Sequence, residues 1–276
     1  MISSFEFMLG YDLDKWRYYG IKEKITMDIS TDTNSHMLIC GASRSGKSYF
    51  EKQLFARLIK SEPDGEFYFA DYKRDKSFKC LRGCVRYYCF DNTLKALDIV
   101  YNIMQKRQSG EDDTSHWVTL IWDEYAVNIL SLQGDKSKEG KQRAEKVTQQ
   151  VSEILMLGIS LNIRIIICCQ TAYQEVFNLG ARLNFGVIVI LGAFSRSNYD
   201  MLMKNHVEEV KDKKFGQGEG SMLLDGELYF IKVGKVEDMD KIEKLCCGAL
   251  LESTEAIEFD GFNDDIDSHD EIHINN

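Results

Sequence analysis

The chain has 276 residues, of which 44% are hydrophobic, which is enough to bury the core of one large domain with small appendages. A single proline argues against proline-rich linkers, and no run of about 18 apolar residues is present that could cross a membrane. Without a leader-like start, we expect a cytoplasmic protein, with no transmembrane segment of its own, whose eight cysteines are reduced thiols.

The net charge of −10 is concentrated near one end of the sequence. Residues 252–276 contain nine acidic residues and no Lys or Arg, and setting these nine charges aside leaves about −1 for the rest of the chain. An electrically mixed body does not exclude DNA as a partner. We interpret residues 251–276 as an acidic, disordered tail, which either docks on a basic partner or simply keeps the protein soluble.

Apolar patterning predicts strands that alternate with helices. The strands are expected at 36–40, 67–70, 117–122, 163–169 and 187–191, and the helices at 47–60, 92–107 and 142–157. Strands this continuously apolar are typical of a parallel sheet buried on both faces. Asp225-Gly226 separates two further strand-like runs and predicts a β-hairpin, followed by a helix over 237–250. Residues 1–35 are expected to form a small β-rich lead-in to a domain that spans residues 36–250.

The segment GASRSGKS at residues 41–48 fits the P-loop pattern G-x-x-x-x-G-K-[ST], with a strand before it and a helix after it. A triphosphate needs inward-facing backbone N–H groups at a helix N-terminus, and glycines permit that backbone course. Lys47 is expected to reach the β- and γ-phosphates and Ser48 to ligate Mg²⁺. This context argues against a chance match in a glycine-rich turn. The predicted ATP-binding residues are Gly41, Ala42, Ser43, Arg44, Ser45, Gly46, Lys47, Ser48 and Tyr49.

Polar side chains also end two of the other predicted strands. The strand in VTLIWDEYA ends at Asp123, which is expected to hold Mg²⁺ through water, and Glu124, which is expected to orient or deprotonate the attacking water. Two acids at a strand end are also common helix N-caps, but their position about 75 residues after the P-loop favours hydrolysis over binding alone. Gln170 ends the fourth strand at the same edge, where it would either sense the γ-phosphate or merely bond to backbone.

Taken together, these segments resemble the FtsK/HerA superfamily of RecA-like P-loop ATPases, and most closely the TcpA-type coupling ATPases of Gram-positive conjugative elements. The likeness runs in the family's order over about 200 residues, through HMLICGASRSGKS, FADYKRDKSF, IWDEYA, RIIICCQT, LNFGVIVILG and GQGEGSMLL. It implies an additional-strand, catalytic-glutamate fold and gives Lys47, Ser48, Asp123, Glu124 and Gln170 the roles described above.

The resemblance also implies that an arginine of one subunit completes the site of the next. Arg196, in SRSNYD, is the candidate for this residue, and Arg182 is the alternative. The sequence departs from the family here, because Ile159 stands where an arginine is often found, and Val187 begins an apolar stretch where another is expected. Lys73, which follows Asp71, is expected near the nucleotide or the subunit boundary.

A lysine-rich segment between the third strand and the next helix offers contacts to DNA phosphates. Its candidates are Lys136, Lys138, Lys141 and Arg143. A pore in a ring needs only a few such side chains per subunit, so an acidic chain can still bind DNA. The alternative is that these residues are simply solvated.

We therefore predict an ATP-dependent DNA translocase that works with ATP and Mg²⁺ as a homohexameric ring, in conjugative transfer or mobilisation of DNA. The acidic tail is expected to dock on a relaxase or a membrane-channel partner, which would recruit the protein to the inner face of the membrane. The alternatives are an ATPase for type VII-like protein export, a viral genome-packaging ATPase, and an assembly factor that binds ATP without pumping. Glu124 beside Asp123 argues against the last of these.

Overall fold

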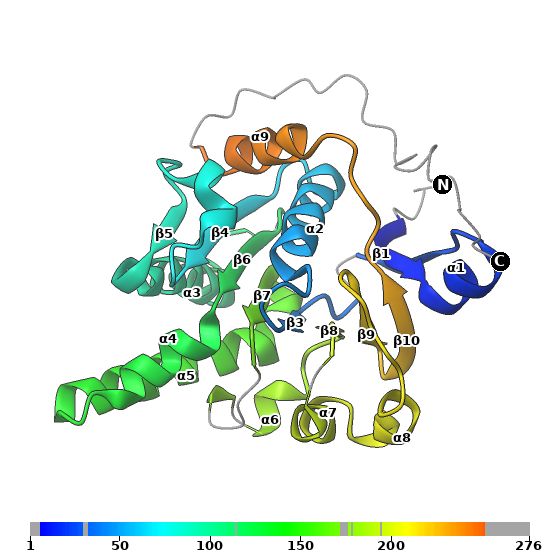
Figure 1. Ribbon diagram of the computed structural model, residues 1–276. Helices are drawn as coiled ribbons and strands as arrows, with labels where there is room; N and C mark the ends of the chain where they lie inside the picture. Colours follow the sequence, from blue (N-terminus) through cyan, green and yellow to red (C-terminus); the bar gives the residue numbers. More distant parts are fainter. Residues whose placement is uncertain are drawn as a thin grey trace.

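The computed structural model describes residues 6–29, 33–113, 115–171, 176–177, 179–193 and 195–251. In these residues one ten-stranded sheet has the order β2-β1-β10-β9-β8-β3-β7-β6-β4-β5 (Figure 1). The part from β8 to β5 is parallel throughout. Its strands are β3 (Met37–Gly41), β4 (Glu66–Asp71), β5 (Tyr87–Cys89), β6 (Val118–Asp123), β7 (Ile163–Cys169) and β8 (Val187–Leu191). The predicted α/β fold with a mainly parallel central sheet is confirmed.

An antiparallel extension continues the sheet beyond β8. Strands β9 (Glu219–Leu224) and β10 (Glu227–Lys232) form the predicted hairpin, and Asp225 and Gly226 both have positive φ, 49° and 86°, as a tight two-residue turn requires. Strand β1 (Glu6–Asp12) pairs with β10, and β2 (Lys24–Asp28) pairs with β1. The N-terminal strands, with the short helix α1 (Leu13–Tyr19) between them, therefore belong to the same sheet.

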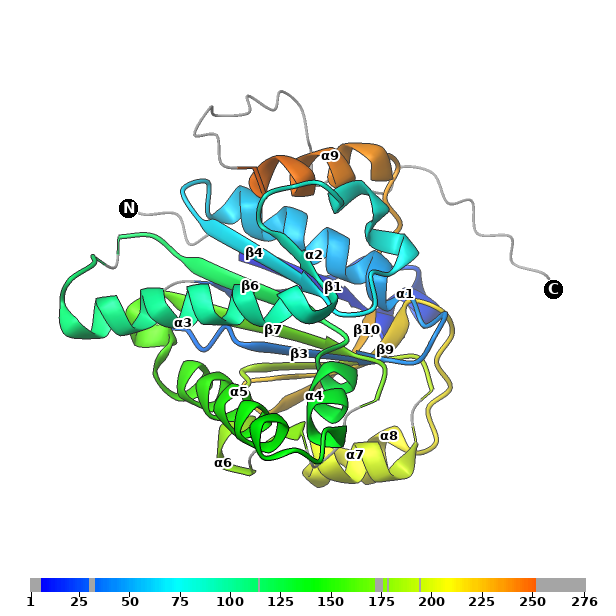
Figure 2. The ribbon, with the colours of Figure 1, turned by 90° about the vertical axis from the view of Figure 1, so that its left-hand side faces the viewer.

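Helices cover both faces of the sheet (Figure 2). On one face lie α2 (Lys47–Ser61), the 3₁₀ helix η1 (Lys76–Leu81) and α9 (Met239–Ala249). On the other lie α3 (Thr93–Ser109), α4 (Tyr125–Gly134) and α5 (Lys138–Leu157). Strand β3 shows the pattern that produces these layers, since Leu38 and Cys40 contact one cluster and Met37 and Ile39 the other.

Short helices fill several connections, before α3, before β7 and on both sides of β8. They are η2 (Phe90–Asn92), η3 (Ile159–Leu161), α6 (Leu179–Arg182), α7 (Arg196–Leu202), η5 (Lys204–His206) and α8 (Val207–Val210). Among the described residues, no helix combines the length and the apolar composition that crossing a bilayer requires.

The lysine-rich segment differs from the sequence prediction, which placed it before a helix starting at Gln142. Helix α5 already begins at Lys138, because the Ser137 hydroxyl caps it by accepting a hydrogen bond from the Gly140 N–H at 3.0 Å. Lys138, Lys141 and Arg143 therefore lie on a helix, and only Lys136 lies in the turn after α4.

A buried ion pair joins α2 to the middle of the sheet. The fully buried Arg164 of β7 donates to both carboxylate oxygens of Glu62, at 2.7 and 2.9 Å, and to the Ser35 hydroxyl at 2.8 Å. Its guanidinium also lies 4.2 Å from the ring centre of Trp117. Glu62 caps the C-terminal end of α2, so this arrangement fixes the helix that begins at the P-loop.

Candidate nucleotide-binding site

The loop between β3 and α2 has the backbone course of a phosphate-binding loop. Gly46 precedes the first residue of α2 with φ 97°, which only glycine adopts without strain. A Cβ atom there would also lie 3.1 Å from the backbone nitrogen of Gly218, in the segment that leads into β9. A hydrogen bond also joins that segment to the loop, because the Gly218 N–H donates to the Ser45 carbonyl at 2.8 Å. Since the loop leads directly into α2, the positive end of the helix dipole faces a ligand bound in the loop.

A pocket of about 270 Å³ opens at this loop. All of the predicted ATP-binding residues except Ser45 line it, and so do three of the residues expected to act on ATP, Asp123, Glu124 and Gln170. The fold brings them together because β3, β6 and β7 are parallel neighbours whose carboxyl ends meet at one edge of the sheet. The structure adds Asp75, Ser77 and Gln217 to the lining.

The Lys47 side chain lies buried among three carboxylates. Its ammonium contacts the Asp123 carboxylate and lies 3.6 Å from Glu51 and 3.8 Å from Glu124. Burial disfavours the charge, but Glu51 and Asp123 outweigh it and hold the pKa of Lys47 well above its ordinary value. The lysine therefore remains a cation that is ready to exchange a carboxylate for a phosphate.

Glu51 is a buried residue that the sequence analysis did not identify. It is 2% exposed, and neither of its carboxylate oxygens has a hydrogen-bond partner among the described residues. Burial, reinforced by Asp123, raises the pKa of Glu51 to about 8. The helical spacing from Lys47 was the available signal, because a residue four positions further along a helix lies on the same face.

Glu124 has an unusual backbone conformation for its residue type. It occupies the left-handed region with φ 59° and precedes the first residue of α4. Strained positions of this kind persist where the surrounding structure holds them, often at functional sites. The Glu124 carboxylate is 3% exposed and lies 3.0 Å from the ammonium of Lys73, which places Lys73 beside the pocket, as expected.

Asp75, between β4 and η1, and Ser77, in η1, add polar groups to the pocket lining, and Asp71 lies nearby at the end of β4. Asp75 accepts a hydrogen bond from the Ser77 N–H at 2.8 Å, and this bond lowers the pKa of Asp75 against the opposing effect of its partial burial. Asp71, at the end of β4, pairs in register with Asp123 and accepts a hydrogen bond from the Tyr87 hydroxyl at 2.7 Å. Burial raises the pKa of Asp71 to about 6, against the effect of that hydroxyl. The resemblance covered this segment, but nothing in the residue types indicated which of them would reach the pocket.

The residues at the pocket fit a magnesium ion that arrives with a phosphate. Ser48 and Asp123 both line the pocket and offer oxygen donors, which Mg²⁺ prefers. Across the described ranges, no group of three or more His, Cys, Asp or Glu residues could hold a metal ion by itself. Magnesium commonly takes one or two protein oxygens together with phosphate oxygens, so this donor set suits it.

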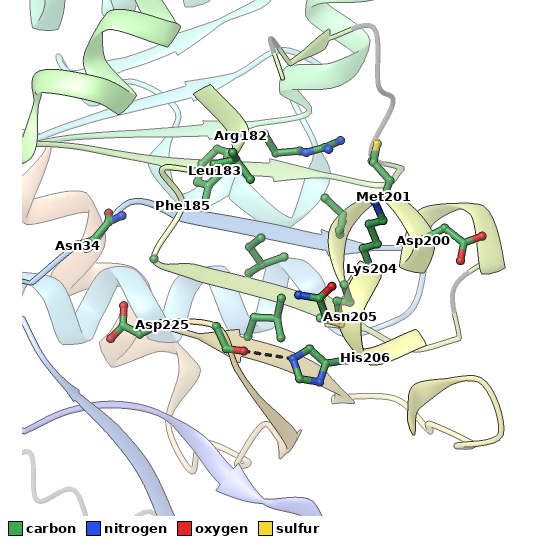
Figure 3. A pocket seen from close by; sticks show the side chains of 16 residues that line it. Asn34, Arg182, Leu183, Phe185, Asp200, Met201, Lys204, Asn205, His206 and Asp225 are labelled. Atoms are coloured by element: carbon green, nitrogen blue, oxygen red, sulfur yellow. Dashed lines mark hydrogen bonds between the residues drawn. The ribbon is translucent and has the colours of Figure 1, made fainter. Parts of the chain in front are cut away.

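The two candidate trans-acting arginines lie beyond opposite ends of strand β8. Arg196 begins α7 after the carboxyl end of β8, at the same edge as the P-loop, whereas Arg182 precedes the start of β8. Neither lines the nucleotide pocket. Arg182 instead lines a second pocket of about 490 Å³ between α6, α7 and the β9–β10 turn (Figure 3), where the His206 ring lies 3.2 Å from the Gly226 carbonyl oxygen.

The candidate DNA contacts lie far from the P-loop along α5. Lys136, Lys138, Lys141 and Arg143 are all exposed. Figure 1 shows α4 and α5 side by side, extending beyond the sheet, with these residues at and near the turn that joins the two helices.

Comparisons with known proteins agree with this fold. No protein-family model matches the chain. An uncharacterised Aquifex aeolicus protein is 35% identical over 66 residues, which cover 22% of this chain and 24% of that protein. Among solved structures, the conjugation coupling protein TcpA of pCW3, a monomer form with ATPγS, superposes with a TM-score of 0.65 at 18% identity, over 80% of this chain and 66% of TcpA.

A second solved structure is the cytoplasmic domain of the type VII secretion ATPase EccC from Thermomonospora curvata. It also has a TM-score of 0.65 at 18% identity, and the match covers 92% of this chain and 32% of EccC. The chain has the fold of the FtsK/HerA-type P-loop ATPases. The resemblance carried by the motifs is thus confirmed at the level of the fold, and the chain spans only part of each of these proteins.

Proposed function

We propose that the chain hydrolyses ATP with Mg²⁺ and couples hydrolysis to DNA translocation as a homohexameric ring, in conjugative transfer or mobilisation of DNA. The observation that carries the hydrolysis step is the convergence of Lys47, Asp123 and Glu124 on one pocket behind a helix N-terminus. Lys47 would release Asp123 and bind the β- and γ-phosphates, and the N–H groups at the start of α2 would hold the remaining phosphate oxygens.

In this proposal Ser48 and Asp123 hold the magnesium ion, which supplies charge neutralisation at the phosphates. Glu124 accepts the proton of the attacking water, and Gln170, half-buried at the end of β7, contacts the γ-phosphate or that water. An arginine of a neighbouring subunit stabilises the charge that develops on the γ-phosphate. Arg196 is the first candidate for this arginine, and Arg182 is the alternative.

DNA as the cargo is supported by the exposed basic residues at and near the α4–α5 turn and by the fold that the chain shares with TcpA. The rate of ATP hydrolysis, measured with double-stranded DNA, single-stranded DNA and no nucleic acid at several salt concentrations, tests the coupling. We expect stimulation by DNA that falls as salt rises. A rate of ATP hydrolysis that is the same with and without either form of DNA would refute DNA as the cargo but not the proposed ATPase activity.

A variant with Gln at Lys136, Lys138, Lys141 and Arg143 tests the contact surface directly. Each lost phosphate contact should reduce the slope of log affinity against log salt by about 1. A Lys95→Gln/Lys146→Gln variant, which removes two exposed lysines from α3 and from further along α5, is the control and should bind DNA as the wild type does.

Protein export is the second candidate, because the match to the type VII secretion ATPase EccC covers 92% of this chain. Stimulation of hydrolysis by an export-signal peptide, in the absence of any response to DNA, would favour it. The proposed ring is tested by light scattering with ATP and the Glu124→Gln variant, for which a species with the mass of six chains is expected.

A further inference from the structure

Four cysteines gather where η1 and the loop after it meet α9. They are Cys80, Cys84, Cys246 and Cys247, and all are free thiols. The Sγ atoms of Cys84 and Cys247 lie 2.7 Å apart, although 163 positions separate the two residues in the chain. The described residues contain no group of three or more His, Cys, Asp or Glu that could hold a metal ion, so this cluster is a thiol pair with neighbours and not a metal site.

The backbone holds the two thiols together independently of the sulfur atoms. The Arg86 N–H donates to the carbonyl of Leu250 at 3.0 Å, which joins the strand that follows Cys84 to the end of α9. On the other side, the Cys84 N–H donates to the carbonyl of Leu81 at 3.1 Å, which fixes Cys84 relative to η1. A disulfide between Cys84 and Cys247 therefore needs little backbone movement.

We propose that Cys84 and Cys247 form a reversible disulfide that fixes α9 against η1 beside the nucleotide pocket. Cys247 is half-buried and Cys84 is 6% exposed, so an oxidant in solution meets Cys247 first. Burial, with the Cys247 sulfur as hydrogen-bond partner, raises the pKa of the Cys84 thiol to about 12, so Cys84 is the less reactive of the two thiols and Cys247 reacts first.

The oxidant is a small-molecule disulfide of the glutathione type. The Cys247 thiolate attacks one of its sulfur atoms, the small-molecule S–S bond breaks, and one small thiolate leaves and takes up a proton. The Cys84 thiolate then attacks Cys247 Sγ, and the second small thiolate leaves and is protonated. The two protein thiols are oxidised, and the small disulfide is reduced to two thiols.

Contacts link both tethered segments to the nucleotide pocket. Asp75 caps η1 and lines the pocket with Ser77. Before α9, the Val236 N–H donates to the hydroxyl of Tyr49, a pocket residue, at 2.5 Å. The disulfide ties the loop after η1 to α9, so it should stabilise the fold and, through these contacts, slow the release of a bound nucleotide.

Another cysteine pair provides a control within the chain. Cys40 and Cys169 are register partners of the neighbouring strands β3 and β7, with Sγ atoms 3.4 Å apart, but both are fully buried in the sheet. Because no oxidant reaches them in the folded protein, the Cys40→Ala variant should oxidise as the wild type does.

The experiment treats the folded protein with oxidised glutathione and counts thiols. We expect two of the eight thiols to disappear, a mass lower by two hydrogen atoms, a cross-linked peptide pair containing Cys84 and Cys247, and a thermal midpoint roughly 5–10 °C higher. Dithiothreitol should reverse all four changes, and Cys247→Ser should prevent them. Cys84→Ser should stop at a mixed disulfide between Cys247 and glutathione, which consumes one thiol and forms no cross-link. Persistence of eight thiols, or a cross-link through Cys80 or Cys246 in place of this pair, would overturn the proposal.

The effect on the pocket rests on the proposed nucleotide binding. It is measured as the binding and the release rate of a fluorescently labelled ATP analogue. Binding by the reduced protein is the reference, and its absence would refute the proposed function but not the disulfide. Slower release from the oxidised wild type than from oxidised Cys247→Ser supports the coupling to the pocket. Equal release rates would refute that coupling.

Discussion

Replacing Lys47 by Met should destabilise the protein even without nucleotide, because the ammonium is buried among carboxylates. Breaking a buried ion pair by removing one partner costs about 3–5 kcal/mol. Glu124 adds little to this cost, because the ammonium of Lys73 lies 3.0 Å from its carboxylate. The loss therefore falls on Asp123 and Glu51, the two residues that hold the pKa of Lys47 high.

We therefore expect Lys47→Met to lower the free energy of unfolding by about 3–5 kcal/mol at pH 7. The measurement is urea unfolding in the absence of nucleotide at pH 7. Lys146→Met is the control, because Lys146 pairs with Asp98 at 3.2 Å on the surface and should lose less than about 1 kcal/mol. The double variant Lys47→Met/Asp123→Asn should recover most of the lost stability. If Lys47→Met unfolds within about 0.5 kcal/mol of the wild type at pH 7, the reasoning about the buried carboxylates is wrong.

Glu124→Gln should retain ATP binding, measured by calorimetry, while hydrolysis falls by at least about 100-fold, and a normal rate would remove Glu124 from the role of base. His36 is fully buried, and burial, assisted by Arg164, lowers its pKa to about 3. As the pH falls below 6.5, the unfolded chain therefore binds a proton at His36 while His36 of the folded protein stays neutral. This histidine alone therefore removes about 2 kcal/mol of stability between pH 7 and pH 5. In urea unfolding, His36→Asn should gain about that much stability relative to the wild type over the same interval, whereas an unchanged difference between the two proteins would contradict this. In mixtures with wild-type subunits, Arg196→Ala should poison hydrolysis more steeply than dilution does, and a linear loss would shift attention to Arg182.

The sequence predicted the parallel part of the fold well because each of its strands carries a local signal. Ile163–Cys169 and Val187–Leu191 have the predicted bounds, since a strand buried on both faces is apolar at every position. The pairing of β1 with β10 had no such signal, because it depends on contacts between Tyr11 and Lys232 across most of the chain. The start of α5 was predicted too late, at Gln142. The segment with Lys138 and Lys141 was interpreted as a polar loop, although Ser137 before it is a typical N-cap residue.

The candidate site divides in the same way. The P-loop, Asp123, Glu124 and Gln170 were predicted because fixed spacings or strand ends identify them. Glu51 and Asp75 were not, because burial in the first case and the course of a loop in the second decide what they contact. The contacts of Asp75 are a property of the assembled fold, and for Glu51 the sequence offered only the spacing of four residues from Lys47, which does not reveal burial.

The contact of Gly218 with the P-loop links the nucleotide pocket to the antiparallel half of the sheet. The Gly218 N–H holds the Ser45 carbonyl, and the Gly218 carbonyl accepts a hydrogen bond from the Val233 N–H at 2.7 Å, just after β10. Gln217, the preceding residue, lines the pocket. A shift of the P-loop on phosphate binding would therefore displace both ends of the β9–β10 hairpin, and β1 and β2 pair with that hairpin in turn. The hairpin thus provides a mechanical connection between the nucleotide pocket and the strands β1 and β2, alongside the contact that α2 makes with β1 through Arg57 and the Met8 carbonyl.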